Sequence, residues 1–280
     1  MATIRETLRA AQARLESAGV PIADHDAAML LAHVLGEDML MMKFNSHRQV
    51  KGEDAAAFDA LLARREKREP LQYILGETDF MGLTFHVEPG VLIPRADTEI
   101  LCEEAIRRLG KNGGKVLDIG TGSGALACSI KKHCENAQVT AVDVSAEALA
   151  VAKANAERNG VQVRFVLSDC FSAVRGETFD MIVSNPPYIS DAQMAELEPE
   201  VLSEPHLALR AANDGLAFYE RISREAKEYL APGGCLLFEI GWQQKDAVCA
   251  LVKRHIGEPF AMKDYGDNWR VVGAELLPPA

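Results

Sequence analysis

The fold of this chain is decided by the stretch Val116-Leu117-Asp118-Ile119-Gly120-Thr121-Gly122-Ser123-Gly124. Its first four residues form an apolar run broken by a single acid, which predicts a buried strand over 116–119. The glycines that follow allow a tight turn and a close approach of the backbone to a ligand. A helical pattern resumes over 125–133. The stretch therefore predicts a strand, a ligand-binding turn and a helix of an open α/β sheet.

Strands and helices continue to alternate after this unit. Apolar runs predict strands over 139–142, 163–167, 179–184 and 235–240, and two short late strands near Ala261 and over 269–276. Helical patterns fill 146–159 and 215–230. Alternation of this kind gives a parallel, doubly wound sheet with helices on both faces.

The N-terminal part has a different character. Helical spacing predicts helices from residue 3 to Gly19, over 26–35 and over 55–68, which together suggest a small all-helical domain. The pattern changes over 78–93, where interspersed glycines and a proline indicate a hairpin. Asp97 is expected to cap a helix over 98–109.

Composition sets broad limits on the function. The chain has 280 residues, 48% of them hydrophobic, and a net charge of -11, which argues against binding nucleic acid mainly through its phosphates. The 6 cysteines show no metal-binding spacing, so we expect reduced thiols in a cytoplasmic protein. No signal peptide or membrane-spanning run is visible. A basic cluster of Arg64, Arg65, Lys67 and Arg68 is interrupted by acids, and we interpret it as a solvated helix face.

The glycine turn is compatible with two classes of cofactor. With Ala125 in the last position it fits a relaxed dinucleotide pattern, and Asp143 after the next strand suits ribose hydroxyls in either class. Asp118 favours S-adenosylmethionine, because a carboxylate there faces a cationic amino-acid group but repels a pyrophosphate. Ser168-Asp169, after the third strand, matches a position that contacts adenine in methyltransferases.

Asn185-Pro186-Pro187-Tyr188 follows the strand predicted over 179–184, at a strand end where α/β sheets bind ligands. Neither proline carries an N–H, so the segment presents its carbonyl groups stiffly. The Asn185 side-chain oxygen and the Pro186 carbonyl can each accept one hydrogen of a planar NH2 group, while Tyr188 packs against that group. The tetrapeptide resembles the signature of methyltransferases that act on amide or exocyclic amino nitrogens.

Further stretches make the resemblance more specific. They are Pro70-Leu71-Gln72-Tyr73-Ile74-Leu75-Gly76, Phe80-Met81-Gly82-Leu83-Thr84-Phe85, Gly90-Val91-Leu92-Ile93-Pro94-Arg95, Glu204-Pro205, Asp214-Gly215-Leu216 and Leu230-Ala231-Pro232-Gly233-Gly234. Over nearly its full length the chain resembles the peptide chain release factor glutamine N5-methyltransferases, the PrmC/HemK family.

The resemblance implies a class I S-adenosylmethionine-dependent methyltransferase fold, Rossmann-like with a mixed seven-stranded sheet, and a small helical N-terminal domain. It implies a substrate-recognition domain over 1–75, a hairpin linker over 76–95 and a catalytic domain over 96–280. The implied substrate is the glutamine of the Gly-Gly-Gln motif in class 1 release factors, methylated on its side-chain nitrogen. The implied product is S-adenosylhomocysteine, and no metal is expected. A monomer without direct nucleic-acid or membrane binding is expected.

The resemblance also assigns residues. Asn185 and Pro186 are expected to be catalytic, and Asn185 to Tyr188 to bind the substrate. The residues expected to contact the cofactor are Asp118, Gly120, Thr121, Gly122, Ser123, Gly124, Asp143, Asp169, Cys170 and Asn185. Whether Cys170 or Phe171 packs on the adenine is left open.

Two other interpretations remain. An adenine N6-methyltransferase acting on DNA or RNA needs the same Asn-Pro-Pro-Tyr geometry, but the acidic charge and the lack of a basic, aromatic-rich segment disfavour it. A catalytically silent binding module is disfavoured by the presence of Asp118, Asp143 and Asn185. Methyl transfer itself needs positioning and charge stabilisation rather than an activated side chain, so we expect the proton to leave to water without a dedicated general base.

Overall fold

A computed structural model describes residues 2–277 of the chain. The chain forms two compact units. One comprises the residues up to Gly76 together with Glu198–Ser203, and the other comprises Glu77–Leu197 and the residues from Glu204 onward. The ends of the predicted domains at Met1 and at 278–280 lie outside the described residues, and the predicted domain boundaries and the recognition role of the first domain stay predictions.

The first unit is helical. It contains α1 (Ile4–Ser17), α2 (Ala23–Leu35), α3 (Met39–Phe44), α4 (Gly52–Arg65) and α5 (Leu71–Leu75), and from the distant segment α10 (Pro199–Leu202). A capping box of Thr3 and Glu6 starts α1, and left-handed Gly36 ends α2. Leu15, Leu30 and Leu62 belong to its shared apolar core. The three predicted helices are confirmed; α3 and α5 were missed because each is too short for a periodic pattern.

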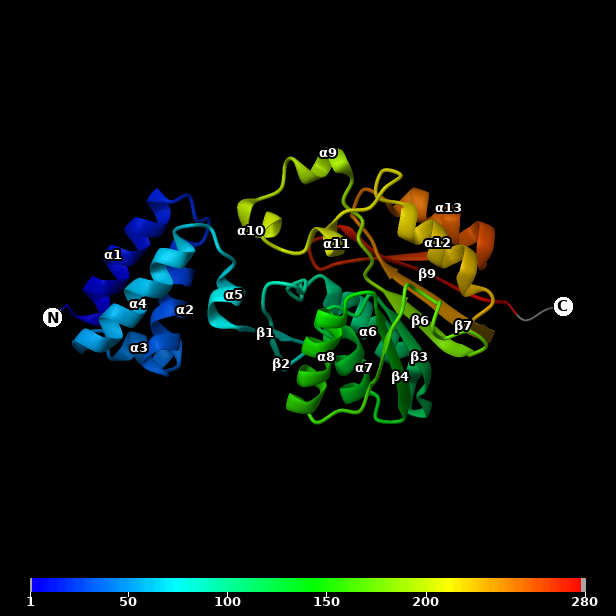
Figure 1. The fold of residues 1–280 in the computed structure, drawn as a ribbon, viewed down its shortest axis with the longest axis horizontal. Coiled ribbons are helices and arrows are strands. Elements are labelled where there is room, and N and C mark those ends of the chain that lie inside the picture. Colours follow the sequence, from blue (N-terminus) through cyan, green and yellow to red (C-terminus); the bar gives the residue numbers. More distant parts are fainter. Residues whose placement is uncertain (1, 278–280) are drawn as a thin grey trace. The chain divides into compact units, whose positions relative to one another are not determined.

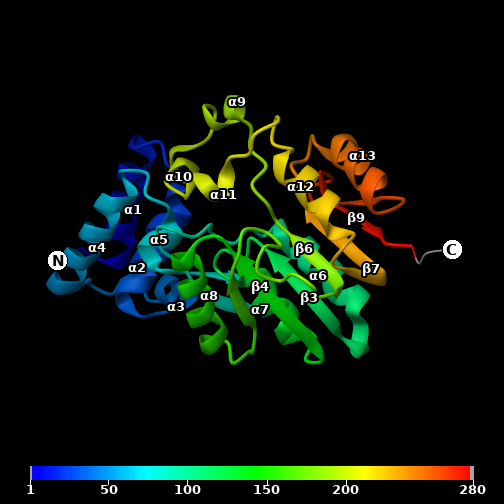
Figure 2. The same ribbon diagram turned by 45° about the vertical axis from the view of Figure 1, so that its right-hand side comes forward.

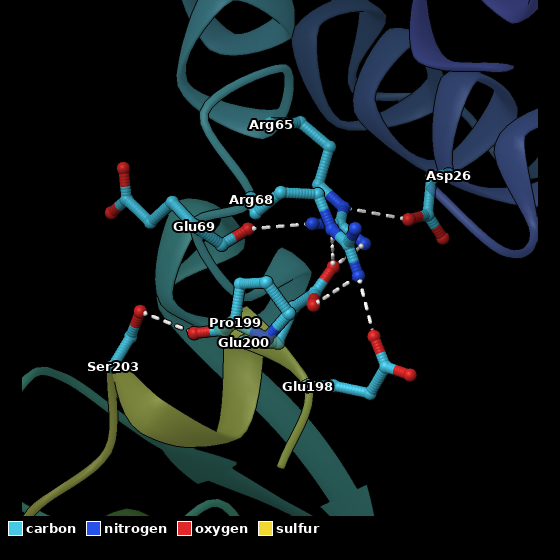
Figure 3. Close-up of polar contacts among 8 residues, drawn as sticks. All are labelled: Asp26, Arg65, Arg68, Glu69, Glu198, Pro199, Glu200 and Ser203. Atoms are coloured by element: carbon cyan, nitrogen blue, oxygen red, sulfur yellow. Dashed lines mark hydrogen bonds and ion pairs between the residues drawn. The ribbon is translucent and has the colours of Figure 1, made fainter. Parts of the chain in front are cut away.

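The prediction that the basic cluster is a solvated face is wrong for two of its members. Arg64 and Lys67 are exposed, but Arg65 is buried and pairs with Asp26 at 2.7 Å and with Glu200 at 2.7 Å. Figure 3 shows Arg65 and Arg68 pointing together toward the carboxylate of Glu200. Arg68 holds that carboxylate at 2.6 Å, so these arginines fasten α10 into the helical unit.

The second unit is built on a seven-stranded sheet of order β5-β4-β3-β6-β7-β9-β8, which confirms the predicted mixed sheet. Its strands are β3 (Gly114–Ile119), β4 (Ala137–Asp143), β5 (Arg164–Leu167), β6 (Phe179–Ser184), β7 (Leu230–Glu239), β8 (Phe260–Lys263) and β9 (Trp269–Glu275). The pairs from β5 to β7 are parallel, and β9 runs antiparallel to both its neighbours. The turned view in Figure 2 shows β4, β3, β6 and β7 close together in the middle of this unit.

Helices cover both faces of the sheet (Figure 1). On one face lie α6 (Thr98–Leu109), α7 (Ala125–His133) and α8 (Ala146–Arg158), and on the other α12 (Ala217–Ala226) and α13 (Lys245–His255). Successive strand residues point to opposite faces, so Val116 joins the first core and Leu117 the second. Burial on both faces explains why these strands read as continuous apolar runs.

The predicted hairpin is present as β1 (Glu77–Phe80) and β2 (Leu83–His86), which pair antiparallel. Phe80 and Phe85 of this hairpin pack into the same apolar core as residues of α6 and α7. Asn155 of α8 accepts a hydrogen bond from the His86 backbone N–H at 2.7 Å and donates one to the His86 carbonyl at 3.0 Å. The residues after His86 lie in a loop rather than a longer strand.

Several element boundaries differ from prediction. The helix predicted over 215–230 is confined to α12, because the chain passes into β7 at Leu230. Asp97 occupies the N-cap position of α6, but its side chain does not cap the helix and instead pairs with Arg270 at 2.8 Å. Four further short helices were not predicted, namely η1 (Gly110–Asn112), α9 (Asp191–Met194), α10 and α11 (His206–Leu209), and neither was the longer α13. Within residues 2–277, no helix has the length and apolar character needed to cross a bilayer.

Candidate active site

A cavity lies at the carboxyl ends of the central strands. The chain places β4 and β5 on one side of β3 and then β6 and β7 on the other, so the connections reverse beside β3, where such sheets bind ligands. The sequence-predicted residues that line this cavity are Asp118, Gly120, Thr121, Gly122, Ser123, Asp143, Asp169, Cys170, Asn185, Pro186 and Pro187. Gly124 and Tyr188 are absent from the lining of this cavity among the described residues.

The glycine turn is held between the ends of β3 and β4. The backbone N–H groups of Gly120 and Thr121 both donate to the Val142 carbonyl, at 2.9 and 3.1 Å. Gly122 donates its N–H to the carboxylate of Asp143 at 2.9 Å, and Ser145 donates to the other oxygen of that carboxylate at 2.9 Å. Asp143 is therefore oriented by two backbone donors at the cavity wall.

Asp118 is a buried carboxyl group at the base of the cavity, only 1% exposed. Its partner is the Thr121 hydroxyl, which donates at 2.7 Å. Burial raises the pKa of Asp118 to about 7, the Thr121 hydrogen bond opposes this rise, and the nearby negative charge of Asp143 adds to it. A buried carboxylate without a cationic partner suits a ligand that brings a positive charge.

Gly124 serves the packing of the turn. It has a φ of +81°, and a Cβ added to it would lie 2.9 Å from the Cβ of Ala152 in α8. Any larger residue would push α7 and α8 apart. Gly124 thus allows α7 to begin in close contact with α8.

The loop after β5 supplies Asp169 and Cys170. Asp169 is exposed and pairs with Arg221 of α12 at 2.6 Å. Cys170 is buried at the cavity with a positive φ of 49°, and burial raises the pKa of its thiol to about 11. Phe171 points into the core instead, where it stacks on Tyr229 with ring centroids 4.4 Å apart. The cavity therefore presents Cys170 and not Phe171.

Asn185 and the two prolines form the opposite wall. The Asn185 amide nitrogen donates to the hydroxyl of Thr98, the first residue of α6, at 3.2 Å. Tyr188 lies beyond the prolines and donates a long hydrogen bond of 3.4 Å to Glu239. The Tyr188 ring packs against the apolar core that contains residues of α12 and α13. This packing stabilises the position of the Asn-Pro-Pro-Tyr corner.

Glu239, at the end of β7, was missed in the sequence. It is 1% exposed, and burial raises its pKa to about 7, against the lowering effects of a Thr98 hydrogen bond and of Arg270. The signal was available: an acid inside the apolar run from Cys235 to Ile240 is a buried charge that needs a reason.

Two loops that resemble family motifs are joined beside the cavity. Glu204 is buried, accepts a hydrogen bond from the Ile93 N–H at 2.9 Å and pairs with Arg95. Gly215 allows a further close approach, since a Cβ there would lie 2.1 Å from the Tyr188 carbonyl oxygen. The first contact joins the loop after β2 to the segment that contains Glu204, and the second brings Gly215 against Tyr188, the last residue of the Asn-Pro-Pro-Tyr corner.

Comparison with known proteins agrees with this geometry. Residues 6–76 match the PrmC N-terminal domain, and residues 83–212 match the methyltransferase small domain. The chain is 43% identical to the release factor glutamine methyltransferase of Geobacter sulfurreducens, over 98% of this chain and 97% of that one. It is 38% identical to the Escherichia coli K12 protein of the same name, over 94% and 95% of the two chains. A solved methyltransferase from Pyrococcus furiosus shares the fold, with a TM-score of 0.54 and 23% identity over 70% of this chain and 90% of that one.

Proposed function

Because the chain belongs to the release factor glutamine methyltransferase family, we propose that it methylates the side-chain nitrogen of the glutamine in the Gly-Gly-Gln motif of class 1 peptide chain release factors. The observation that carries the proposal is the hydrogen bond from the Asn185 amide nitrogen to Thr98. Because the nitrogen is engaged there, the amide oxygen is left as the acceptor for a substrate.

The residues present fit S-adenosylmethionine as the methyl donor. Asp118 is a buried carboxyl with a raised pKa and no cationic partner among the described residues, which suits an ammonium group. Asp143 is held by two N–H donors in an orientation that suits ribose hydroxyls. Cys170 provides an apolar contact for a ring. When bound, this cofactor supplies an electrophilic methyl group.

The catalytic residues in this proposal are Asn185 and Pro186. A glutamine amide nitrogen is a weak nucleophile because its lone pair is delocalised into the carbonyl group. The Asn185 oxygen and the Pro186 carbonyl accept the two N–H hydrogens, which holds the nitrogen in line and stabilises the positive charge that develops on it. Pro187 stiffens the backbone between them and Tyr188. The proton leaves to water after transfer.

The adenine N6-methyltransferase alternative is not favoured. The relatives that cover nearly the whole chain carry the release factor name. The net charge of -11 also disfavours a protein that holds nucleic acid through its phosphates.

We propose a division of labour along the chain. The helical domain over 1–75 recognises the release factor, the hairpin over 76–95 links the domains, and residues 96–280 carry the reaction. The protein acts as a monomer in the cytoplasm, without direct contact to nucleic acid and without a metal. The six cysteines fit this compartment, since all are free thiols and five are buried.

The experiment that tests the proposal is methyl transfer from labelled S-adenosylmethionine to a purified class 1 release factor. Mass spectrometry of the tryptic peptides should place one added methyl on the Gly-Gly-Gln glutamine. A release factor with that glutamine replaced by alanine is the matched control and should take up no label. Transfer to an adenine-containing oligonucleotide, with none to the release factor, would overturn the proposal.

A further inference from the structure

The Asn185 carboxamide can act as an acceptor only if its oxygen, and not its nitrogen, faces the substrate. We propose that Thr98 and Glu239 are positioning residues that fix this orientation through a chain of hydrogen bonds ending on the Glu239 carboxyl group. The inference deepens the proposed function and rests on it, because it concerns the acceptor that holds the substrate amide.

The chain runs through three residues from three separate elements. The Asn185 amide nitrogen, after β6, donates to the Thr98 hydroxyl at 3.2 Å. Thr98, at the start of α6, is 7% exposed, and a hydrogen bond from its side chain is the largest effect that lowers the pKa of Glu239, at the end of β7. Tyr188 reaches the same carboxyl group at 3.4 Å. The first and last residues of the Asn-Pro-Pro-Tyr corner are therefore both linked to the buried carboxyl group of Glu239, Asn185 through Thr98 and Tyr188 directly.

The direction of these bonds follows from the acid. In its ionised form the Glu239 carboxylate has no hydrogen to donate, so it accepts the single hydrogen of the Thr98 hydroxyl. That hydroxyl then has only lone pairs to offer to Asn185, which must present its NH2 group. The amide oxygen is thereby turned toward the cavity. An amide in place of the acid removes this constraint, because its NH2 group can donate to Thr98 and release the Thr98 hydrogen toward the Asn185 oxygen.

The surroundings of Glu239 agree with a role beyond packing. Its second oxygen, Oε2, is buried without a hydrogen-bond partner among residues 2–277. Arg270, whose charge lowers the pKa of Glu239, is already paired with Asp97 at 2.8 Å and with Asp264 at 3.0 Å. Tyr219 donates to the Glu239 backbone carbonyl and not to its carboxyl group. Burying an acid without an ionic partner costs free energy. Such an acid is expected where its charge, or its ability to accept hydrogen bonds, serves the site.

The first test compares three threonine variants in the full-length protein. Thr98→Val removes the hydroxyl and keeps the shape, Thr98→Ser restores a hydroxyl, and Thr140→Val makes the same change at a buried threonine of β4 outside the cavity. We expect Thr98→Val to lower kcat for release factor methylation about tenfold or more, and Thr98→Ser to stay within about threefold of wild type. Thr140→Val should match wild type, and S-adenosylhomocysteine should bind all three with dissociation constants within about threefold.

The second test separates positioning from support of the fold. Glu239→Gln removes a buried charge, so at pH 8 we expect its melting temperature to equal or exceed that of wild type, while kcat falls about tenfold. A purely structural role for Glu239 predicts that the two quantities move together. Because the residues act in one chain, the Thr98→Val/Glu239→Gln double variant should be no slower than the slower single variant.

The outcomes distinguish the inference from the function on which it rests. Wild-type protein that methylates the release factor, with Thr98→Val and Glu239→Gln as fast as Thr140→Val, would overturn the positioning role alone. Additive losses in the double variant would also overturn it, by showing two independent contributions. Wild-type protein that binds S-adenosylhomocysteine but leaves the release factor unmethylated would overturn the proposed function and this inference with it.

Discussion

In the helical unit, carboxylates that are largely shielded from solvent pair with arginines, whereas Asp118 in the cavity and Glu239 next to Tyr188 form no ion pair among residues 2–277. Asp26 and Glu200 share the buried guanidinium of Arg65. Burial alone raises the pKa of Glu200, yet hydrogen bonds from Arg68 and Arg65 lower it to about 2. Burial without such partners raises the pKa of Asp118 and of Glu239 to about 7. The same kind of side chain is therefore a fixed charge in one unit and a titrating group in the other.

The difference has an energetic meaning. Asp118 and Glu239 have raised pKa values in the folded state, so folding favours their protonated forms. The contribution of each to the free energy of unfolding is fully present below the unfolded-state pKa near 4 and is lost as the pH rises through the folded-state pKa of about 7. The loss is on the order of 3–4 kcal/mol for each group, since one pKa unit corresponds to about 1.4 kcal/mol. For Glu200 the sign is opposite: its contribution is present above pH 4.5 and is lost as pH falls toward 2. Paired carboxylates stabilise the helical unit, and the unpaired Asp118 suits the positively charged ligand that we propose for the cavity.

The largest expected effect comes from breaking the paired cluster. Arg65→Met leaves Asp26 buried without its cation, and removal of one partner from a buried ion pair costs about 3–5 kcal/mol. We expect urea denaturation to show this loss in the helical signal. Arg64→Met is the matched control, since Arg64 pairs with Glu69 at the surface and should change stability by less than about 1 kcal/mol. Equal denaturation midpoints for the two variants would show that burial of the pair has no energetic weight.

The next effect concerns the Asn-Pro-Pro-Tyr corner of the cavity, which we propose to be catalytic. Asn185→Ala removes the proposed acceptor, and loss of one preorganised contact of this type costs about 3 kcal/mol, or roughly 100-fold in kcat. Calorimetry should find cofactor binding within about tenfold of wild type, because Asp118 and Asp143 remain. Asn136→Ala, at an exposed asparagine outside the cavity, is the control. Undiminished turnover in Asn185→Ala would remove this residue from the mechanism.

The two regions also differ in how much the sequence predicts. The cavity was predictable because three of its residues lie at the ends of apolar runs: Asp118 near the end of β3, Asp143 at the end of β4 and Asn185 after β6. Parallel strands bring these ends together whatever the loops between them do. The mixed sheet and the helices over 98–109 and 125–133 followed from the same periodicity.

The ion-pair cluster was not predictable, because its partners are far apart in the chain. Arg65 lies in a run of charges that is typical of a solvated helix, and nothing near it in sequence marks Glu200 as its partner. Glu239 was missed for a different reason, since its apolar neighbours were interpreted as a strand and the acid among them was passed over. Tyr188 was correctly placed at the corner, but its hydroxyl points to Glu239 and not into the cavity lining.

A smaller effect is expected for the pH dependence of ligand binding. If Asp118 receives the ammonium group of the cofactor, affinity rises as Asp118 ionises, so binding should strengthen roughly tenfold between pH 5.5 and 7, where the ligand amino group stays charged. Asp118→Asn should weaken binding at pH 7 by about tenfold and flatten this pH profile. Isothermal titration calorimetry with S-adenosylhomocysteine measures both. A profile that stays equally steep in the variant would assign the titration to another group, such as Glu239, and would separate Asp118 from the ammonium site.

The smallest effect is expected where a carboxylate is paired but exposed. Asp169 at the cavity rim pairs with Arg221 at 2.6 Å, and their side chains are 60% and 32% exposed. Solvent screens such a pair, so Arg221→Gln should change stability by less than about 1 kcal/mol and cofactor affinity by less than about threefold. Arg210→Gln, which breaks the exposed pair with Asp191, is the matched control. If Arg221→Gln weakened the cofactor tenfold while the control did not, the orientation of Asp169 would depend on Arg221. The cavity would then use a paired carboxylate, Asp169, beside the unpaired Asp118, and the presence of an ion pair would no longer distinguish the structural acids from those of the site.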